Sequence, residues 1–218
     1  SGCSNLRSAT LPKDTKTVRQ GMFSGCKRLM NITLPESVTV IEDNAFSSCS
    51  DLKELVLPTG LTTIGKAAFS DVGLIDIDLP NGLQSIGISA FNSTNFTDIV
   101  LPDSVTDIGA YAFQGCGKLE SVTLPKNITE LKDGTFQFCW NLKTISLPAG
   151  LLEINGAFGY CGSLEAITIP DSVTTIGDTS FNGCSSLKSI YFSKNLTKIG
   201  YEAFAYCEGL VNVSLPEK

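Results

Sequence analysis

The sequence contains no histidine, only one tryptophan and only two methionines among its 218 residues. Without histidine the chain cannot form a Ser-His-Asp triad, a Cys-His dyad or an imidazole-bound zinc or haem site. It also lacks any run of about 18 apolar residues, so no segment is expected to span a membrane. The 16 Lys and Arg are outnumbered by 22 Asp and Glu, and this net charge of −6 argues against a nucleic-acid partner.

The chain is instead rich in one repeated pattern. Leu-Pro dipeptides, or their equivalents, recur every 22 or 23 residues along the whole sequence. They begin at Leu11, Leu34, Leu57, Leu79, Leu101, Leu124, Leu147, Ile169, Phe192 and Leu215. A phenylalanine follows each of the first nine at a nearly fixed distance: Phe23, Phe46, Phe69, Phe91, Phe113, Phe136, Phe158, Phe181 and Phe204. Such a period is typical of a solenoid, in which each turn buries its apolar side against its neighbours.

The repeating unit, L-x-x-I-x-L-P-x-x-V-T-x-I-G-x-x-A-F-x-x-C, predicts two extended segments per turn. The alternation in L-x-x-I-x-L indicates a short parallel strand that ends at the proline. V-T-x-I-G predicts a second short strand, and its glycine suggests a turn with unusual backbone angles. Helix is expected to be scarce, at most a short turn around A-F-x-x-C. We predict a single mainly β-and-coil solenoid over residues 1–218, with about ten turns.

Three segments carry a family resemblance most closely: 41–49, 108–116 and 176–184. Their pattern resembles the BspA-like leucine-rich repeats, also called the Treponema pallidum type, and the resemblance covers essentially the full chain. It implies a leucine-rich-repeat solenoid from a surface or secreted protein of a bacterium or protist. It also implies adhesion or protein binding, with no catalytic residues and no cofactor to carry over.

Eight cysteines occupy one recurring position, three residues after the ladder phenylalanine or its equivalent in the first turn. They are Cys3, Cys26, Cys49, Cys116, Cys139, Cys161, Cys184 and Cys207, with Val72 and Thr94 in the two remaining turns. A stack of small buried thiols explains this spacing, since free cysteine is often buried. Disulfides between adjacent turns are the alternative, although parallel side chains would hold the Cβ atoms farther apart than a disulfide prefers. A linear ladder does not provide a tetrahedral zinc site.

Outward-facing positions on the first strand gather acidic residues over three consecutive turns. These positions hold Glu54, Val56, Asp76, Asp78, Asp98 and Val100. We expect them on a concave strand surface, where they could bind a basic protein partner or weakly bind a cation. The alternative is a solvated face that prevents unwanted strand pairing. An open sheet offers no cleft for a glycosidase pair of carboxylates.

A second candidate surface is aromatic. Phe138 and Tyr160 share one register position on adjacent turns, and Trp140 follows Cys139. Exposed aromatic side chains are typical anchors at binding sites. They could equally fold over the edge of the core and cover the thiols, since aromatic residues serve both purposes.

Together these features predict a non-enzymatic protein-binding module without metal or cofactor, located outside the cell or on its surface. The expected partner is a protein of the host matrix or of a host or neighbouring cell. The alternative function is a rigid spacer that displays other domains. The chain starts within a turn and has no distinct capping unit, so we expect a fragment of a longer protein whose ends could associate end to end. Six Asn-x-Ser/Thr sites, at Asn31, Asn92, Asn95, Asn127, Asn195 and Asn212, would be glycosylated only in a eukaryotic secretory pathway.

Overall fold

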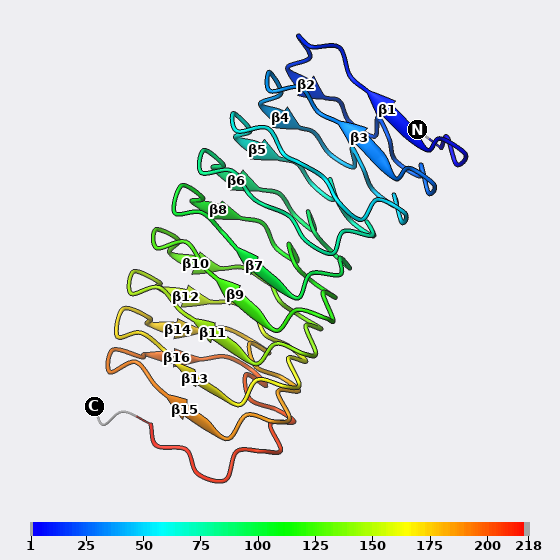
Figure 1. Cartoon of the computed structure of the whole chain (residues 1–218). Coiled ribbons are helices and arrows are strands. Elements are labelled where there is room, and N and C mark those ends of the chain that lie inside the picture. Colours follow the sequence, from blue (N-terminus) through cyan, green and yellow to red (C-terminus); the bar gives the residue numbers. More distant parts are fainter. Residues whose placement is uncertain (1, 216–218) are drawn as a thin grey trace.

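In the computed structural model, which describes residues 2–215, each repeat forms one turn of an elongated, curved β-solenoid (Figure 1). Ser1 and Pro216, the latter belonging to the last Leu-Pro pair, lie outside the described residues. All pairs of strands are parallel, with partners one repeat apart, such as Ser8 with Asn31 and Thr17 with Val40. The predicted solenoid of stacked turns with parallel strands is therefore confirmed.

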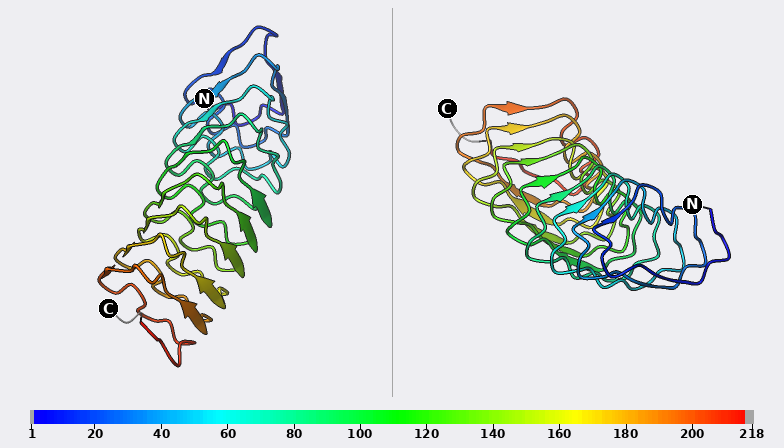
Figure 2. Two further views of the ribbon diagram at one scale, coloured as in Figure 1. Left: turned by 90° about the vertical axis from the view of Figure 1, so that its left-hand side faces the viewer. Right: turned by 90° about the horizontal axis from the view of Figure 1, so that it is seen from above.

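One ladder consists of two-residue strands from the V-T-x-I segments. Its strands are β2 (Thr17–Val18), β4 (Val40–Ile41), β5 (Thr63–Ile64), β6 (Ser85–Ile86), β8 (Asp107–Ile108), β10 (Glu130–Leu131), β12 (Glu153–Ile154), β14 (Thr175–Ile176) and β16 (Lys198–Ile199). They form a five-stranded and a four-stranded sheet, divided between β8 and β10. Figure 2 shows that the stack bends, with these short strands along the inner side of the bend.

The other ladder consists of three-residue strands from the L-x-x-I-x-L segments. Its strands are β1 (Ser8–Thr10), β3 (Asn31–Thr33), β7 (Asp98–Val100), β9 (Ser121–Thr123), β11 (Thr144–Ser146), β13 (Ala166–Thr168) and β15 (Ser189–Tyr191). They form three separate sheets: β1 with β3, β7 with β9 and β11, and β13 with β15. This ladder lies away from the inner side of the bend (Figure 2), so the prediction that its surface is concave was wrong.

The expected strand is missing at 54–56, 76–78 and 212–214. Aspartate and glutamate are disfavoured in strands because their side chains compete for backbone groups. Asp76 does so directly: its Oδ1 accepts a hydrogen bond from the Ile77 N–H at 2.8 Å. The wider spacing on the outer side of a bend also weakens hydrogen bonds between turns, which explains why this ladder breaks more often than the inner one.

The glycine of the I-G pair is required for a reason other than the turn that the sequence predicts. Gly87 and Gly109 have no left-handed backbone. They are needed because neighbouring turns crowd together: a Cβ on Gly87 would lie 2.5 Å from the carbonyl carbon of Gly65, and one on Gly109 would lie 2.4 Å from the Ile88 nitrogen. The expectation of a turn with unusual angles at this glycine was therefore wrong.

Left-handed backbone occurs instead at two positions around each A-F pair, here called slot A, before the alanine, and slot B, two residues after the phenylalanine. In one turn these are Asn44 (φ 56°) and Ser48 (φ 61°). Alternating backbone conformation aims the N–H groups of this segment at the next turn, as in Asn44 to the Lys66 oxygen and Phe46 to the Ala68 oxygen, both at 2.8 Å. The A-F-x-x-C segment is a tight turn, and the described residues contain no α-helix.

The core is a continuous stack of phenylalanine rings. The nine ladder rings have centroids 5.2–5.8 Å apart, with planes within 14° of parallel. The seven central rings are completely buried. Alanine or another small residue before each ring leaves room for this close stacking, and each ring stabilises both neighbouring turns.

The cysteines line the same core as free thiols, six of them buried. Six thiols, those from Cys49 onward, donate to the carbonyl oxygen of the ladder phenylalanine in the preceding turn, for example Cys49 to Phe23 and Cys139 to Phe113, both at 3.2 Å. The thiol is a second donor to a carbonyl that already accepts a backbone N–H, as the Phe23 oxygen does from Cys26, and this extra bond favours cysteine over other small apolar residues. Thr94 differs, because its hydroxyl bonds the Phe91 oxygen of its own turn at 2.9 Å.

Candidate functional site

The acidic strip, defined as Glu54, Asp76, Asp78 and Asp98 with Val56 and Val100, faces solvent throughout. Val56 is 84% exposed and Val100 is 65% exposed. Only Asp98 and Val100 belong to a strand, β7, because the two preceding turns are irregular here. The strip therefore joins carboxylates and bare apolar side chains on one outward surface.

Three carboxylates of the acidic strip surround a shallow hollow of about 300 Å³. Asp76, Asp78 and Asp98 line it, together with the backbone and apolar side chains of 77–79 and 99–102. Asp76 is held by the Ile77 N–H, and Asp98 accepts a hydrogen bond from the Ser121 hydroxyl. Among residues 2–215 no group of three or more acidic or thiol side chains is placed to hold a metal ion. The hollow is suited to a cationic side chain, which needs one or two carboxylates.

The aromatic edge, defined as Phe138, Trp140 and Tyr160, is a second continuous surface. The Phe138 and Tyr160 rings stack at a centroid distance of 5.0 Å, and Trp140 lies 6.3 Å from Phe138 at an angle of 55°. Trp140 is 57% exposed and Tyr160 is 44% exposed, while Phe138 is half-buried. The structure thus brings Phe138 and Tyr160 together, as their shared register position predicts, places Trp140 beside Phe138, and leaves Trp140 and Tyr160 open to solvent.

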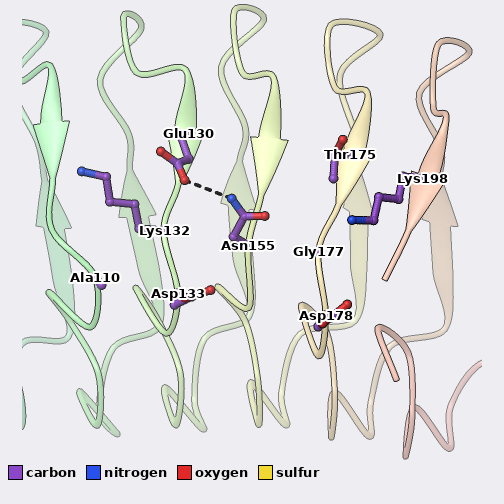
Figure 3. A pocket seen from close by; sticks show the side chains of 9 residues that line it. All are labelled: Ala110, Glu130, Lys132, Asp133, Asn155, Thr175, Gly177, Asp178 and Lys198. Carbon is purple, nitrogen blue, oxygen red and sulfur yellow. Dashed lines mark hydrogen bonds between the residues drawn. The ribbon is translucent and has the colours of Figure 1, made fainter. Parts of the chain in front are cut away.

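A third candidate site is a hollow of about 500 Å³ on the inner ladder, which was not predicted from the sequence. Its lining includes Glu130, Lys132, Asp133, Asp178 and Lys198 (Figure 3). Glu130 accepts a hydrogen bond from Asn155 at 3.0 Å, and Lys132 pairs with Asp107 at 2.5 Å. The sequence did contain an indication of this hollow, because charged residues occur directly before and after the isoleucine of V-T-x-I-G. Some of the charged groups in the hollow already bond to other groups of the protein, so fewer of them are free to bind a ligand than on the acidic strip or the aromatic edge.

The thiols do not form a reactive site. Burial raises the pKa of Cys184 to about 12, and burial also raises the pKa of Cys49 to about 12. A nucleophilic cysteine needs the opposite shift, because the thiolate is the reactive form. Cys49 and Cys184 are therefore structural, whereas at Cys116 burial raises the pKa but hydrogen bonds with Cys139 and Thr94 outweigh it and lower the pKa.

The family model described as BspA type leucine rich repeat region matches the chain in six copies, over residues 1–93, 63–156 and 155–218. Among solved structures, the chain is similar to the T. pallidum leucine rich repeat protein, with 37% identity, 72% of this chain and 77% of that chain covered, and a TM-score of 0.67. It is also similar to a leucine-rich repeat protein from Bacteroides ovatus, with 26% identity, coverage of 97% and 76%, and a TM-score of 0.65.

A leucine rich cell surface protein from Faecalibacterium prausnitzii is 25% identical, with 96% of this chain and 73% of that chain covered and a TM-score of 0.55. No curated protein sequence matched the chain. Among residues 2–215, no helix is long and apolar enough to cross a membrane.

Proposed function

The chain belongs to the BspA-type leucine-rich-repeat family, and from this premise we propose that it is a non-enzymatic protein-binding module of a bacterial surface or secreted protein. Leucine-rich repeats generally mediate contacts between proteins, because a fixed core supports outward side chains that vary from turn to turn. The similarity to the F. prausnitzii cell surface protein supports a location outside the cell.

The acidic strip carries the proposal. Carboxylates beside exposed Val56 and Val100 combine an ionic and an apolar surface, as protein interfaces do at their rims and centres. The hollow between Asp76, Asp78 and Asp98 accommodates a lysine or arginine side chain from the partner. The partner is therefore a protein with a basic surface, from the host matrix or from a host or neighbouring cell, bound in an adhesin-like manner. The aromatic edge provides a second contact surface.

The test measures binding of the purified solenoid to immobilised extracellular-matrix extract and to intact host cells. Replacing Asp76, Asp78 and Asp98 with asparagine keeps side-chain size and removes the charges. We expect affinity to fall by about tenfold or more, because truncating or neutralising charged contacts at an interface costs upwards of about 1.4 kcal/mol. The matched control replaces Asp14, Asp51 and Asp71, also exposed, and should leave binding unchanged. Equal binding by both triple variants would contradict the proposal.

A second candidate function is a rigid spacer, which the uninterrupted phenylalanine stack favours. Nine stacked rings and hydrogen bonds between successive turns resist bending between repeats. In that case the isolated solenoid would bind neither matrix nor cells, and only a chain with additional domains would do so. Protease treatment of intact source cells tests the location: a surface protein is degraded while a cytosolic marker survives.

A further inference from the structure

The aromatic edge places bulky residues on left-handed backbone. Slot B has this backbone in every turn: glycine occupies it in three turns, serine or aspartate in three, and aromatic residues in the other three, namely Phe138 (φ 62°), Tyr160 (φ 60°) and Tyr206 (φ 57°). Left-handed backbone costs a residue with a Cβ about 1–2 kcal/mol, and bulky residues rarely adopt it. Backbone strain of this kind often accompanies a functional site. Two adjacent strained aromatic residues therefore suggest a purpose other than stability.

Glycines next to the edge hold its rings in place. A Cβ on Gly117 would lie 2.8 Å from the Trp140 ring, so one side of the indole rests on this backbone. Tyr160 packs in the same way against Gly183, where a Cβ would lie 2.7 Å from its ring, and Phe138 stacks on its other side. The edge is a preorganised row of rings over three turns, with the indole of Trp140 as its most exposed part.

The turn segments that carry these rings contain no charged residue, and the nearest charged residue in the preceding turn is Lys118, next to Gly117. The three edge segments 137–141, 159–163 and 182–186 contain Gln, Asn, Ser, Gly, Phe, Trp, Tyr and Cys, but no Asp, Glu, Lys or Arg. In the N-terminal turns the equivalent segment 24–28 carries a lysine and an arginine. An uncharged edge offers no ionic partner to a phosphate, a nucleic acid or a strongly charged polypeptide.

Polar atoms beside the rings remain available for hydrogen bonds. The Oε1 atom of Gln137 accepts a bond from Gln114 at 2.7 Å, which leaves its amide nitrogen to donate. Asn182 is only 6% exposed, and its Oδ1 has no hydrogen-bond partner within the described part of the chain. Gly159 lies between these two residues in the register, and the Gln137 side chain lies 3.4 Å from the place where a Cβ on Gly159 would be. The Asn182 oxygen is therefore enclosed, and it does not form part of the exposed surface of the edge.

Backbone addition by an extended peptide is disfavoured at this edge. The Phe138 N–H already donates to the Gly159 oxygen at 2.8 Å, and the Tyr160 N–H to the Asn182 oxygen at 2.6 Å. An added strand would need free backbone groups. Recognition must therefore use ring faces and neutral amide or hydroxyl side chains, a combination that matches the apolar C–H faces and the hydroxyl groups of sugar rings.

From these observations we propose that the aromatic edge binds a neutral glycan chain, with one sugar ring stacked on Trp140 and neighbouring units against Tyr160 and Phe138. The hydroxyl groups of the sugar both donate and accept hydrogen bonds, and one of them can accept a bond from the Gln137 amide nitrogen. This site is independent of the acidic strip, and it stands if the proposed protein partner is not found.

Trp140 is the sole tryptophan of the chain, so its fluorescence reports on the site directly. The emission is recorded during titration with five neutral hexasaccharides: cellohexaose, maltohexaose, laminarihexaose, mannohexaose and fully N-acetylated chitohexaose. At least one should change the emission and protect Trp140 from acrylamide quenching, with saturation below about 1 mM, the range of a contact with few hot-spot residues. Heparin, as a charged glycan, should give no effect.

Variants distinguish edge binding from a general effect. Phe138→Gly and Tyr160→Gly suit the left-handed backbone and keep the tryptophan, and each should weaken sugar binding by about tenfold. Tyr191→Ala removes an exposed aromatic residue elsewhere and should not weaken it. The proposal is overturned if none of the five sugars affects Trp140, or if calorimetry shows unchanged sugar binding to Trp140→Ala. A peptide that quenches Trp140 where all five sugars fail would assign the edge to a polypeptide partner.

Discussion

Phe136 and Phe138 are two residues apart in one turn, yet they belong to different regions of the molecule. Phe136 is fully buried in the ring ladder, between Phe113 and Phe158. Phe138 lies on the aromatic edge with left-handed backbone, half-buried against Tyr160. The ladder position is phenylalanine in nine turns, whereas the edge position varies among glycine, serine, aspartate and aromatic residues. The difference separates what the fold requires from what it tolerates and can use for binding.

The largest expected effect comes from interrupting the ladder. Phe113→Ala should lower the free energy of unfolding by about 3–5 kcal/mol, because it removes a buried ring and leaves a cavity between two other rings. Urea titration followed by circular dichroism measures the change. Phe113→Leu, which fills most of the volume, should cost about 1.5 kcal/mol. Equal losses for the two variants would show that filled volume does not explain the stability of the ladder.

Substituting a glycine of the inner ladder should lower the free energy of unfolding almost as much as interrupting the phenylalanine stack. Gly87→Ala places a Cβ 2.5 Å from the carbonyl carbon of Gly65. Backbone atoms cannot move aside as a flexible side chain can. We expect a loss of about 3 kcal/mol, within the range of overpacking and strain. Gly82→Ala is the matched control, since its Cβ would meet nothing closer than 3.7 Å. A small effect of Gly87→Ala would mean that the turns separate easily.

Alkaline pH should lower the stability of the solenoid through the buried thiols of the ladder. The folded-state pKa of Cys184 is raised to about 12 by burial, against 9.0 for an ordinary thiol. Below pH 9 its contribution to stability is fully present; above it the unfolded thiol ionises and the contribution is lost towards pH 12. Thermal melts are recorded at about pH 8 and about pH 10.5. The free energy of unfolding should fall between these two pH values in both proteins, and the fall should be smaller in Cys184→Val than in the unaltered chain, by about 1–2 kcal/mol.

Valine suits this control because Val72 occupies the same position in another turn. If the unaltered chain and Cys184→Val lose stability equally on going to alkaline pH, the decline arises from other groups.

The smallest effect is expected on the edge itself, and its sign is unusual. Tyr160→Gly and Tyr160→Ala both remove the ring, but only alanine keeps the strain of left-handed backbone. The glycine variant should therefore be more stable than the alanine variant by about 1 kcal/mol, the reverse of the usual order in regular structure. Thermal melts of both variants measure the difference. A more stable alanine variant would show that slot B carries no strain.

Most of the fold was predictable because one repeat determines it. The positions of the phenylalanines, cysteines and prolines predict the solenoid, the stacked core and the parallel strands. Three features were not predictable from the pattern alone: the irregular backbone at 76–78, the reason for Gly87, and which ladder lies on the inner side of the bend. They depend on the distance between neighbouring turns and on competition by side chains such as that of Asp76, neither of which a register position reveals.

The candidate surfaces were predictable in composition but not in conformation. The sequence shows that Phe138 and Tyr160 share a register position, and the structure adds that this position has left-handed backbone and that the rings stack. The unpaired oxygen of Asn182 beside the edge could not be expected from its place in the repeat. Sequence periodicity identifies neighbours well, but strain and unsatisfied polar atoms require coordinates.

The separation of ladder and edge is tested most directly by urea unfolding of Phe136→Ala and Phe138→Ala side by side. The same substitution is made twice in one turn, two residues apart. We expect Phe136→Ala to lose about 3–5 kcal/mol and Phe138→Ala to lose less than about 1 kcal/mol. Equal losses would contradict the account, because the edge would then be part of the core and not a surface available for binding.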